Sequence, residues 1–235
     1  MTRTPTDDAR RVLGECVLFR DLDAEERNVL FARVRTRSYA AGETIFLMGS
    51  VGDSLMAVLS GTVRISMPSP DGKEIVLAII QPREVFGEIA MLDGKERTAD
   101  AKAIGPCSLA ILERRDVLAF LKDNPKVWPK LVDVLCARLR KTDQHIAEIA
   151  LLELPTRLAK TLLRFANEQP QAAAPGGLQV SLSQRELGNI CGASRESINK
   201  CLGGWQRRGI VQIEDGVIFV TNRTALEELA KLEDA

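Results

Sequence analysis

The sequence predicts an α+β chain made of a β-roll, a long helix, and a C-terminal domain of shorter helices with a small hairpin. Three patterns support this prediction. Short alternating segments between residues 37 and 112 are separated by glycine-containing turns about every ten residues, as in a β-sandwich or jelly roll. Apolar residues between 125 and 152 recur at steps of four and three, and helix caps follow beyond 154. The predicted domains are therefore residues 1–123, 124–153 and 154–235.

Length and composition place the chain among soluble globular proteins. Its 235 residues are enough for two domains that each have a core, and it is 45% hydrophobic and 27% charged. The formal net charge is zero, so bulk charge does not predict a partner. No apolar run approaches the ~18 residues that span a membrane, and the N-terminus lacks the apolar segment of a signal peptide. We expect a cytoplasmic protein with no membrane partner.

The residues that usually hold metals or perform catalysis are sparse. The five cysteines lack CxxC or zinc-knuckle spacing, so we expect them to be small core residues: Cys16, Cys107, Cys136, Cys191 and Cys201. His145 is the single histidine, and no Ser/His/Asp set, Walker loop or Rossmann fingerprint is present. Enzyme activity, a metal site and a cofactor are therefore not predicted.

The N-terminal elements follow from caps and turn residues. A helix is predicted over residues 6–20 and another over Ala24–Val34, with Asp23 as its N-cap. The clearest predicted strands are Leu55–Leu59, Val63–Met67, and Ile75–Ile80 after an Asp71-Gly72 turn.

The stretch Phe86–Ala99 carries the residues most suited to a small ligand. Gly87 lets a ligand approach the backbone closely, and a buried carboxylate at Glu88 can accept from a sugar hydroxyl. Arg97 offers fixed charged donors to a phosphate, and the Thr98 hydroxyl adds a neutral donor. These residues predict a pocket for one phosphate and one ribose. The alternative is that Arg97 is a surface residue of a hairpin, with Glu88 as its ion-pair partner.

The long helix has the spacing of a coiled-coil seam. The seam positions are Trp128, Val132, Leu135, Leu139, Thr142, Ile146 and Ile149. We therefore expect this helix to pair with its copy in a second chain. Thr142 is the polar seam position, and one polar residue in a seam often fixes the register of the two helices. A break at Leu154-Pro155 is expected to end the helix, with the next helix running from Thr156 to Glu168.

The C-terminal domain contains a helix-turn-helix pattern. Ser183 and Glu186 form a capping box at the start of one helix, and Gly192 follows that helix as a tight turn. Ser194 then caps a second helix over 195–208. A hairpin over 210–221 with an Asp-Gly turn and a helix over 224–232 complete the domain.

The start of the second helix carries a set of residues that can read DNA bases. Residues 183–208 include five basic and two acidic side chains, a local charge of +3. Arg195, Glu196, Asn199 and Lys200 share one face; arginine can bind guanine bidentately and glutamate can accept from cytosine. The hydroxyls of Ser183, Ser194 and Ser197 suit phosphate contacts. Alternatively, Glu196 and Lys200 form an exposed ion pair worth ~0.3–0.5 kcal/mol.

Two motifs carry a resemblance to a known family. The Gly-Glu-x-Ala-x-Leu and Arg-Thr-Ala parts of Phe86–Ala99 resemble the phosphate-binding cassette of the Crp/Fnr superfamily of bacterial transcription regulators, and residues 182–197 resemble its DNA-binding helices. The resemblance runs from about Leu18 to Val220. It implies an eight-stranded roll, a homodimer, and double-stranded DNA with a palindromic TGTGA-like site. The implied effector is cyclic AMP or cyclic GMP, with cyclic AMP favoured.

The resemblance also assigns residues. The ligand contacts it implies are Gly87, Glu88, Ile89, Ala90, Arg97 and Thr98 in the cassette, with Thr142 and Asp143 near the base. In some relatives, a loop at the position of residues 169–177 contacts RNA polymerase. Asp143 and Lys200 depart from the serine and arginine that the family commonly has, which puts the recognised purine and one DNA base position in doubt. Gly203-Gly204 lies within a helix at a cost of ~1 kcal/mol per glycine, and close packing against the neighbouring domain is one explanation.

Two other functions remain open on the sequence. Relatives sense oxygen through a four-cysteine iron–sulfur cluster or carbon monoxide through haem, but Cys16 alone near the N-terminus and a roll without histidine do not match those ligand sets. The chain could instead be a cyclic-nucleotide-binding regulatory subunit of an enzyme.

Overall fold

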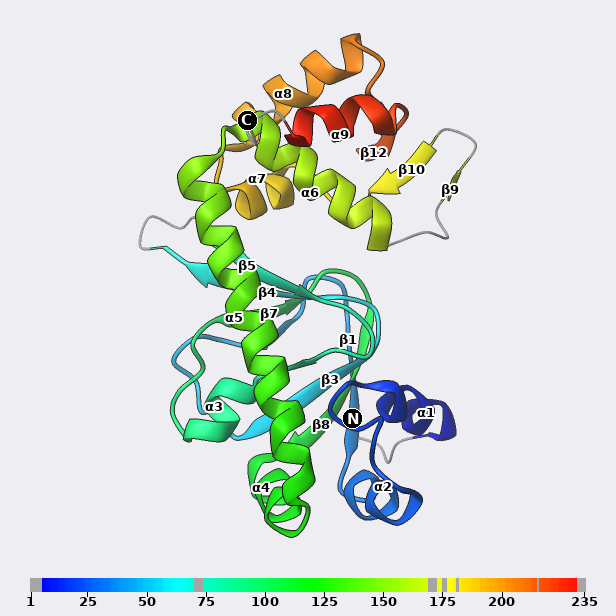
Figure 1. The fold of residues 1–235 in the computed structure, drawn as a ribbon, viewed down its shortest axis with the longest axis vertical. Coiled ribbons are helices and arrows are strands. Elements are labelled where there is room, and N and C mark those ends of the chain that lie inside the picture. The colour runs from blue at the N-terminus through cyan, green and yellow to red at the C-terminus, as the bar shows by residue number, and fades with distance from the viewer. Residues whose placement is uncertain are drawn as a thin grey trace. The chain divides into compact units, whose positions relative to one another are not determined.

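The computed structural model describes residues 6–69, 74–168, 173–174, 177–180, 182–214 and 216–231. The chain divides into two compact units, residues 1–140 and 141–235 (Figure 1). The Asp71-Gly72 turn, most of the 169–177 loop and Asp215 of the hairpin turn lie outside the described residues. The division falls inside the long helix α5 (Trp128–Leu151), so each unit is described by itself, and the predicted three-part division stays a proposal.

The N-terminal unit is built on two four-stranded antiparallel sheets. The strands of the first, called the inner sheet, are in the order β1 (Arg35–Tyr39), β8 (Cys107–Glu113), β3 (Ser54–Ser60) and β6 (Val85–Phe86). Those of the second, the outer sheet, are in the order β2 (Thr44–Phe46), β7 (Asp100–Ala103), β4 (Val63–Pro68) and β5 (Glu74–Ile80). The predicted α+β class with an N-terminal roll is confirmed.

Strand β3 shows why the inner sheet lies in the middle. Its first five residues, 54–58, are all buried. Leu55 and Ala57 belong to an apolar cluster shared with helices, whereas Met56 and Val58 belong to a cluster shared with the outer sheet. Side chains alternate between the two faces of a strand, so a continuous buried run means that both faces are covered. The unit therefore has three layers: helices, inner sheet and outer sheet.

The helical layer is formed by α1 (Asp7–Glu15), α2 (Ala24–Phe31) and α4 (Arg114–Asp123), whose buried residues join one apolar cluster with the inner sheet (Figure 1). Asp23 caps α2 through a complete capping box, as predicted. The prediction of one helix over 6–20 is wrong beyond Glu15, because Cys16 adopts an extended backbone with φ −61° and ψ 139°. A 3₁₀ turn, Pro125–Val127, leads into α5.

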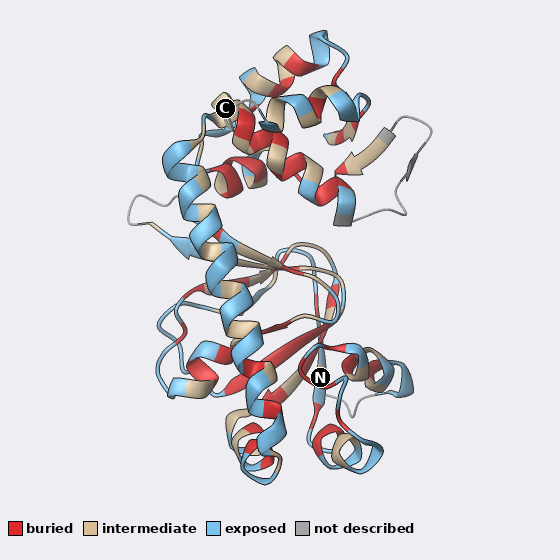
Figure 2. Ribbon diagram, viewed as in Figure 1, coloured by how far each residue is buried: buried red, intermediate tan, exposed pale blue. Residues whose placement is uncertain are grey.

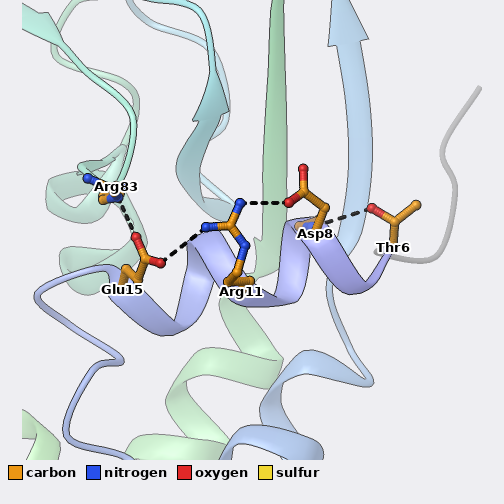
Figure 3. A network of polar contacts seen from close by, with 6 residues as sticks. Thr6, Asp8, Arg11, Glu15 and Arg83 are labelled. Carbon is orange, nitrogen blue, oxygen red and sulfur yellow. Dashed lines mark hydrogen bonds and ion pairs between the residues drawn. The ribbon is translucent and has the colours of Figure 1, made fainter.

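A chain of ion pairs ties α1 to the turn before β6 (Figure 3). Arg11 contacts Asp8 at 2.8 Å and Glu15 at 3.4 Å, and Glu15 contacts Arg83 at 2.6 Å. Arg83 has a φ of +74° and is the sole non-glycine residue with positive φ in the described part of the chain. Such a backbone costs an L-residue roughly 1–2 kcal/mol. The pair with Glu15 therefore helps to hold a strained turn that leads into the Phe86–Ala99 stretch.

The C-terminal unit combines four helices with a small sheet. The helices are α6 (Leu154–Glu168), α7 (Gln184–Cys191), α8 (Arg195–Arg207) and α9 (Arg223–Lys231). The strands are in the order β11 (Val211–Glu214), β12 (Val217–Val220), β10 (Gly177–Val180) and β9 (Ala173–Ala174). The predicted helix-turn-helix and hairpin are confirmed. The predicted start of α6 at Thr156 is wrong by two residues, because Pro155 lies in the first turn of α6, where its missing N–H is not needed.

Candidate nucleotide pocket and DNA interface

The middle of the Phe86–Ala99 stretch folds as a short helix, α3 (Glu88–Asp93). Glycines with left-handed backbones flank it: Gly87 at φ 80° and Gly94 at φ 73°. These conformations favour glycine because a Cβ would be crowded there. This helix was not predicted from the sequence, since six residues are too few to show helical periodicity.

Arg97 follows α3 and lies inside the protein, 4% exposed. Its Nη1 donates to the Gly87 carbonyl oxygen at 2.9 Å, and its Nη2 donates to both the carbonyl oxygen and the Oγ of Ser54 at 2.9 Å. The guanidinium carbon lies 4.3 Å from the centroid of the Phe46 ring. Its Nε is buried without a hydrogen-bond partner, and no carboxylate of the described residues lies within ion-pair distance.

This environment suits an anion. Burial lowers the pKa of the Arg97 guanidinium, while the nearby Asp53 and Glu88 carboxylates raise it in part. Arginine stays charged under these conditions. A buried cation without an ion-pair partner is unfavourable, so an anionic ligand at this place would gain a strong interaction in a poorly solvated site.

Glu88 is fully buried and forms an ion pair with Arg138 of α5. The Glu88 Oε1 accepts from Arg138 Nη1 at 2.6 Å, and Arg138 Nη2 donates to the Val85 carbonyl oxygen at 3.0 Å. The Glu88 Oε2 is buried without a hydrogen-bond partner, so it can accept from a ligand hydroxyl. The alternative of a surface Arg97–Glu88 pair is wrong: both side chains are buried, and Glu88 pairs with Arg138.

Arg138 was not among the residues predicted for the ligand site. Its link to the pocket could not be read locally, because Glu88 is 50 positions away in the sequence. A signal did exist: Arg138 precedes Thr142 by four residues, so the two share one side of α5. A search for charged residues one turn from the polar seam position would have found it.

The remaining predicted ligand residues are less enclosed. Thr98 and Ile89 are exposed, and Ala90 is buried. On α5, Thr142 is half-buried and Asp143 is exposed. The structure thus brings Gly87, Glu88 and Arg97 together, and the ligand roles of all the predicted residues stay predictions.

Much of α5 carries apolar side chains that its own chain does not cover (Figure 2). Val132 is 52% exposed, Leu139 61% and Ile146 60%, all at predicted seam positions. By contrast, Leu131 on another side of the helix is 1% exposed. The seam is therefore an uncovered apolar face.

The cysteines divide into buried and accessible residues. Cys16, Cys107 and Cys191 are buried, and burial raises the pKa of each thiol, that of Cys16 to about 12. Cys201 is half-buried. Cys136 is exposed, so the prediction that all five are core residues is wrong for it, because it lies on an outward side of α5.

The helix-turn-helix is fixed by its caps. Ser183 and Glu186 exchange both bonds of the predicted capping box. Gly192 closes α7 at φ 61°, and the Ser194 Oγ accepts from the Ser197 amide at 3.1 Å. The turn also needs Gly188, since a Cβ there would lie 2.7 Å from the Ala193 carbonyl oxygen.

Helix α8 has one buried side and one exposed side. Ile198, Leu202 and Trp205 are buried. The predicted base-reading residues are all exposed: Arg195, Glu196, Asn199 and Lys200. Glu196 and Lys200 form no ion pair within the described residues, so the alternative reading does not describe this structure. A Cβ at Gly203 or Gly204 would meet no atom of the C-terminal unit within 4 Å, so close packing within that unit does not explain the pair.

Within the part of the chain that the structure describes, every helix is too short or too polar to cross a membrane.

Two family models match the chain. Residues 36–124 match the cyclic nucleotide-binding domain, and residues 156–229 match the Crp-like helix-turn-helix domain. The first match includes Glu88 and Arg97, and the second includes all of α7 and α8.

Curated relatives cover nearly the whole chain. A CRP-like cAMP-activated global transcriptional regulator from Mycobacterium tuberculosis is 30% identical over 222 residues, covering 94% of this chain and 99% of the relative. The cyclic AMP receptor protein of Thermus thermophilus is 33% identical over 213 residues, with 91% and 96% covered. The crystal structure of a CRP-family regulator from Thermus thermophilus matches with a TM-score of 0.74 at 28% identity, covering 85% of this chain and 100% of that one.

These relatives are transcription regulators rather than enzymes, so the alternative of an enzyme's regulatory subunit finds no support. Crp-like regulators use a cyclic nucleotide as an effector rather than a resident cofactor. The chain belongs to the Crp/Fnr superfamily of transcription regulators.

Proposed function

We propose that the chain is a homodimeric transcription regulator whose affinity for DNA is set by a cyclic mononucleotide, cyclic AMP in preference to cyclic GMP. One observation carries the ligand: Arg97 is buried without an ion-pair partner among the described residues, near Glu88, whose Oε2 has no hydrogen-bond partner. A cyclic nucleotide supplies both an anion and a ribose hydroxyl. One relative named as cAMP-activated and another named as a cyclic AMP receptor support the choice of base.

In the proposed complex, Arg97 and Thr98 bind the cyclic phosphate. The Glu88 Oε2 accepts from the ribose 2′-hydroxyl, and the backbone around Gly87, Ile89 and Ala90 lies along the sugar and phosphate. Arg138 does not need to contact the nucleotide, because its ion pair with Glu88 at 2.6 Å already fixes the carboxylate. Thr142 and Asp143 are proposed to lie near the base.

A second copy of the chain is the proposed cover for α5. The exposed seam, with Val132, Leu139 and Ile146 at its centre, is the face that a coiled coil would bury. Such a dimer would present two recognition helices, and a palindromic site needs them about 34 Å apart. The nucleotide can shift the dimer toward that arrangement only by its differential affinity for the two states.

The DNA contact is proposed for the exposed side of α8. Arg195 would bind guanine bidentately, Glu196 would accept from cytosine, and Lys200 would make a single contact in place of an arginine fork. This predicts a TGTGA-like half-site with one altered or relaxed position. Contact of the 169–177 loop with RNA polymerase rests on the family resemblance alone.

Isothermal titration of nucleotide-free, dimeric protein with cyclic AMP and cyclic GMP tests the proposal. We expect micromolar binding of cyclic AMP that Arg97→Leu weakens by at least about 100-fold, the scale of a lost buried charge interaction. Arg37→Leu is the matched control, because Arg37 also lies over an aromatic ring, Tyr39, but is largely exposed. No heat with either nucleotide would overturn the proposed effector and favour a regulator with another effector or none.

A further inference from the structure

Arg114, the first residue of α4, contacts both segments that hold Arg97 and Glu88. Its Nε donates to the Met91 carbonyl oxygen at 2.7 Å, and its Nη2 donates to that of Leu92 at 3.5 Å. Both acceptors belong to the last turn of α3. Its backbone N–H donates to the Asp53 carbonyl oxygen at 2.7 Å, immediately before β3.

Helix α3 needs such a contact more than a longer helix would. The last carbonyl groups of any helix lack partners within the helix, and helices of this length are not stable alone. An arginine at the C-terminal end supplies hydrogen bonds to those carbonyls and a favourable charge for the helix dipole. The guanidinium lies directly against the end of α3, since a Cβ on Gly94 would be 3.1 Å from its Nη2.

The other end of α3 lies at the pocket. Glu88 is the first residue of the helix, and the carbonyl oxygen of Gly87 holds Arg97 Nη1. On the opposite side, Ser54 follows Asp53 and holds Arg97 Nη2 with both its carbonyl oxygen and its Oγ. Arg114 therefore contacts both segments that bind the Arg97 guanidinium. The Arg114 side chain contacts α3, and the Arg114 backbone N–H contacts the residue before β3.

We propose that Arg114 is a positioning residue for nucleotide binding: it sets α3 against the start of β3 and thereby fixes the spacing of Glu88 and Arg97. The proposal rests on the proposed function, since it concerns the same ligand. Arg114 acts through α3 and does not contact the nucleotide. Lysine is a poor substitute because a single ammonium cannot reproduce a planar fork directed at two carbonyl oxygens.

Arg114→Gln and Arg114→Lys, with Arg115→Gln as the matched control, test this role. Arg115 is the neighbouring arginine, but it is exposed and pairs with Glu113 at 2.7 Å. In titrations with cyclic AMP, we expect Arg114→Gln to raise the Kd at least about tenfold, as for one lost hydrogen bond to a charged group. Arg114→Lys should lie between the wild type and Arg114→Gln, and Arg115→Gln should match the wild type.

Hydrogen exchange on the nucleotide-free protein gives a readout that does not depend on the ligand. In Arg114→Gln, amides of residues 88–94 should exchange faster, while those of β3 and β8 should not change. If the wild type binds no cyclic nucleotide, the proposed function fails, but faster exchange in α3 still supports the anchoring by Arg114.

Two results would overturn the proposal. One is wild-type affinity in Arg114→Gln with unchanged exchange in α3. The other is a lower unfolding midpoint without any loss of affinity in the folded protein, because Arg114 would then stabilise the fold without positioning the pocket. If Arg114→Gln does not fold, Arg114→Lys carries the same comparisons.

Discussion

The charged residues of the two candidate sites are held in opposite ways. In the N-terminal unit, Glu88 is fully buried and Arg97 is 4% exposed, and backbone groups fix both sides of Arg97. In the C-terminal unit, Arg195, Glu196 and Lys200 are exposed on α8. Glu88 and Arg97 are thus part of the folded core, whereas the residues predicted to read DNA lie on the surface of theirs.

The difference follows from the size and charge of the proposed ligands. A cyclic phosphate has one charge, so its attraction to arginine is strong only where water is largely excluded. DNA presents many charges along its backbone, and exposed basic side chains gain affinity by releasing its counterions. Changes in the pocket should therefore affect folding as well as binding, and changes on α8 should affect binding alone.

Arg138→Met is the substitution expected to have the largest effect. It removes the cation that faces Glu88 and leaves a fully buried carboxylate without its ion pair. We expect the free energy of unfolding of the N-terminal unit to fall by about 3 kcal/mol. Urea denaturation measures it. The double variant Arg138→Met/Glu88→Leu should recover most of the loss, and a loss below about 0.5 kcal/mol in the single variant would contradict a buried ion pair.

Arg195→Ala tests the opposite case. It should raise the Kd for a TGTGA-like site about 10- to 100-fold, because a bidentate guanine contact is lost. The free energy of unfolding should stay within about 0.5 kcal/mol of the wild type, since the side chain is exposed. Fluorescence anisotropy with the intact site, and with a site in which the guanine is replaced, separates base reading from phosphate attraction. Equal losses on both sites would exclude base reading by Arg195.

Glycine substitutions sharpen the comparison at a smaller scale. Gly204→Ala should stabilise the protein by about 0.5–1 kcal/mol, because alanine favours a helix and its Cβ would meet no atom within 4 Å. Gly52→Ala should destabilise it, because its Cβ would lie 2.1 Å from the Ala90 Cβ beside the pocket. Thermal unfolding compares the two. A destabilised Gly204→Ala protein would indicate a contact that a single chain does not contain.

Replacing His145 is expected to have the smallest effect on stability. His145 is also an exception to the comparison of the two units, since it is a half-buried titratable group in the C-terminal unit. Burial, and then Arg164, lowers its pKa, while Glu148 raises it. As the pH falls, His145 therefore takes up a proton first in the unfolded chain, near pH ~6.5. Its contribution to the free energy of unfolding is full above that pH and decreases as the pH drops below it. Between about pH 7 and 5, urea denaturation should show a smaller decrease in the free energy of unfolding for His145→Gln than for the wild type. Equal decreases in the two proteins would exclude His145 as the cause.

Local signals predicted the elements that local interactions form. Asp23 and Ser183 were recognised as caps because each bonds to a residue three positions along the chain. The β-roll was predicted from turn residues, and Glu88 and Arg97 from their cassette. Pro155 was misread as ending a helix, because proline is equally suited to the first turn of the next one.

Long-range interactions account for what the sequence analysis missed. Helix α3 depends on Arg114, which is 23 positions away from Met91. The ion pair between Glu88 and Arg138 joins α3 to α5, a helix that follows the whole roll. Neither Arg114 nor Arg138 lies in a local sequence pattern that predicts its contact, because each contact forms only after the roll has folded. For the same reason, only the structure revealed the left-handed backbone of Arg83, at a position where glycine would be expected.

The ring beneath Arg97 bears on how fast the pocket can respond. The guanidinium lies 4.3 Å from the centroid of Phe46, and no carboxylate of the described residues pairs with it. An aromatic face attracts a cation without forming an ion pair. In the proposed complex, an arriving phosphate therefore has no ion-pair partner of Arg97 to displace, and a departing phosphate leaves none that must return.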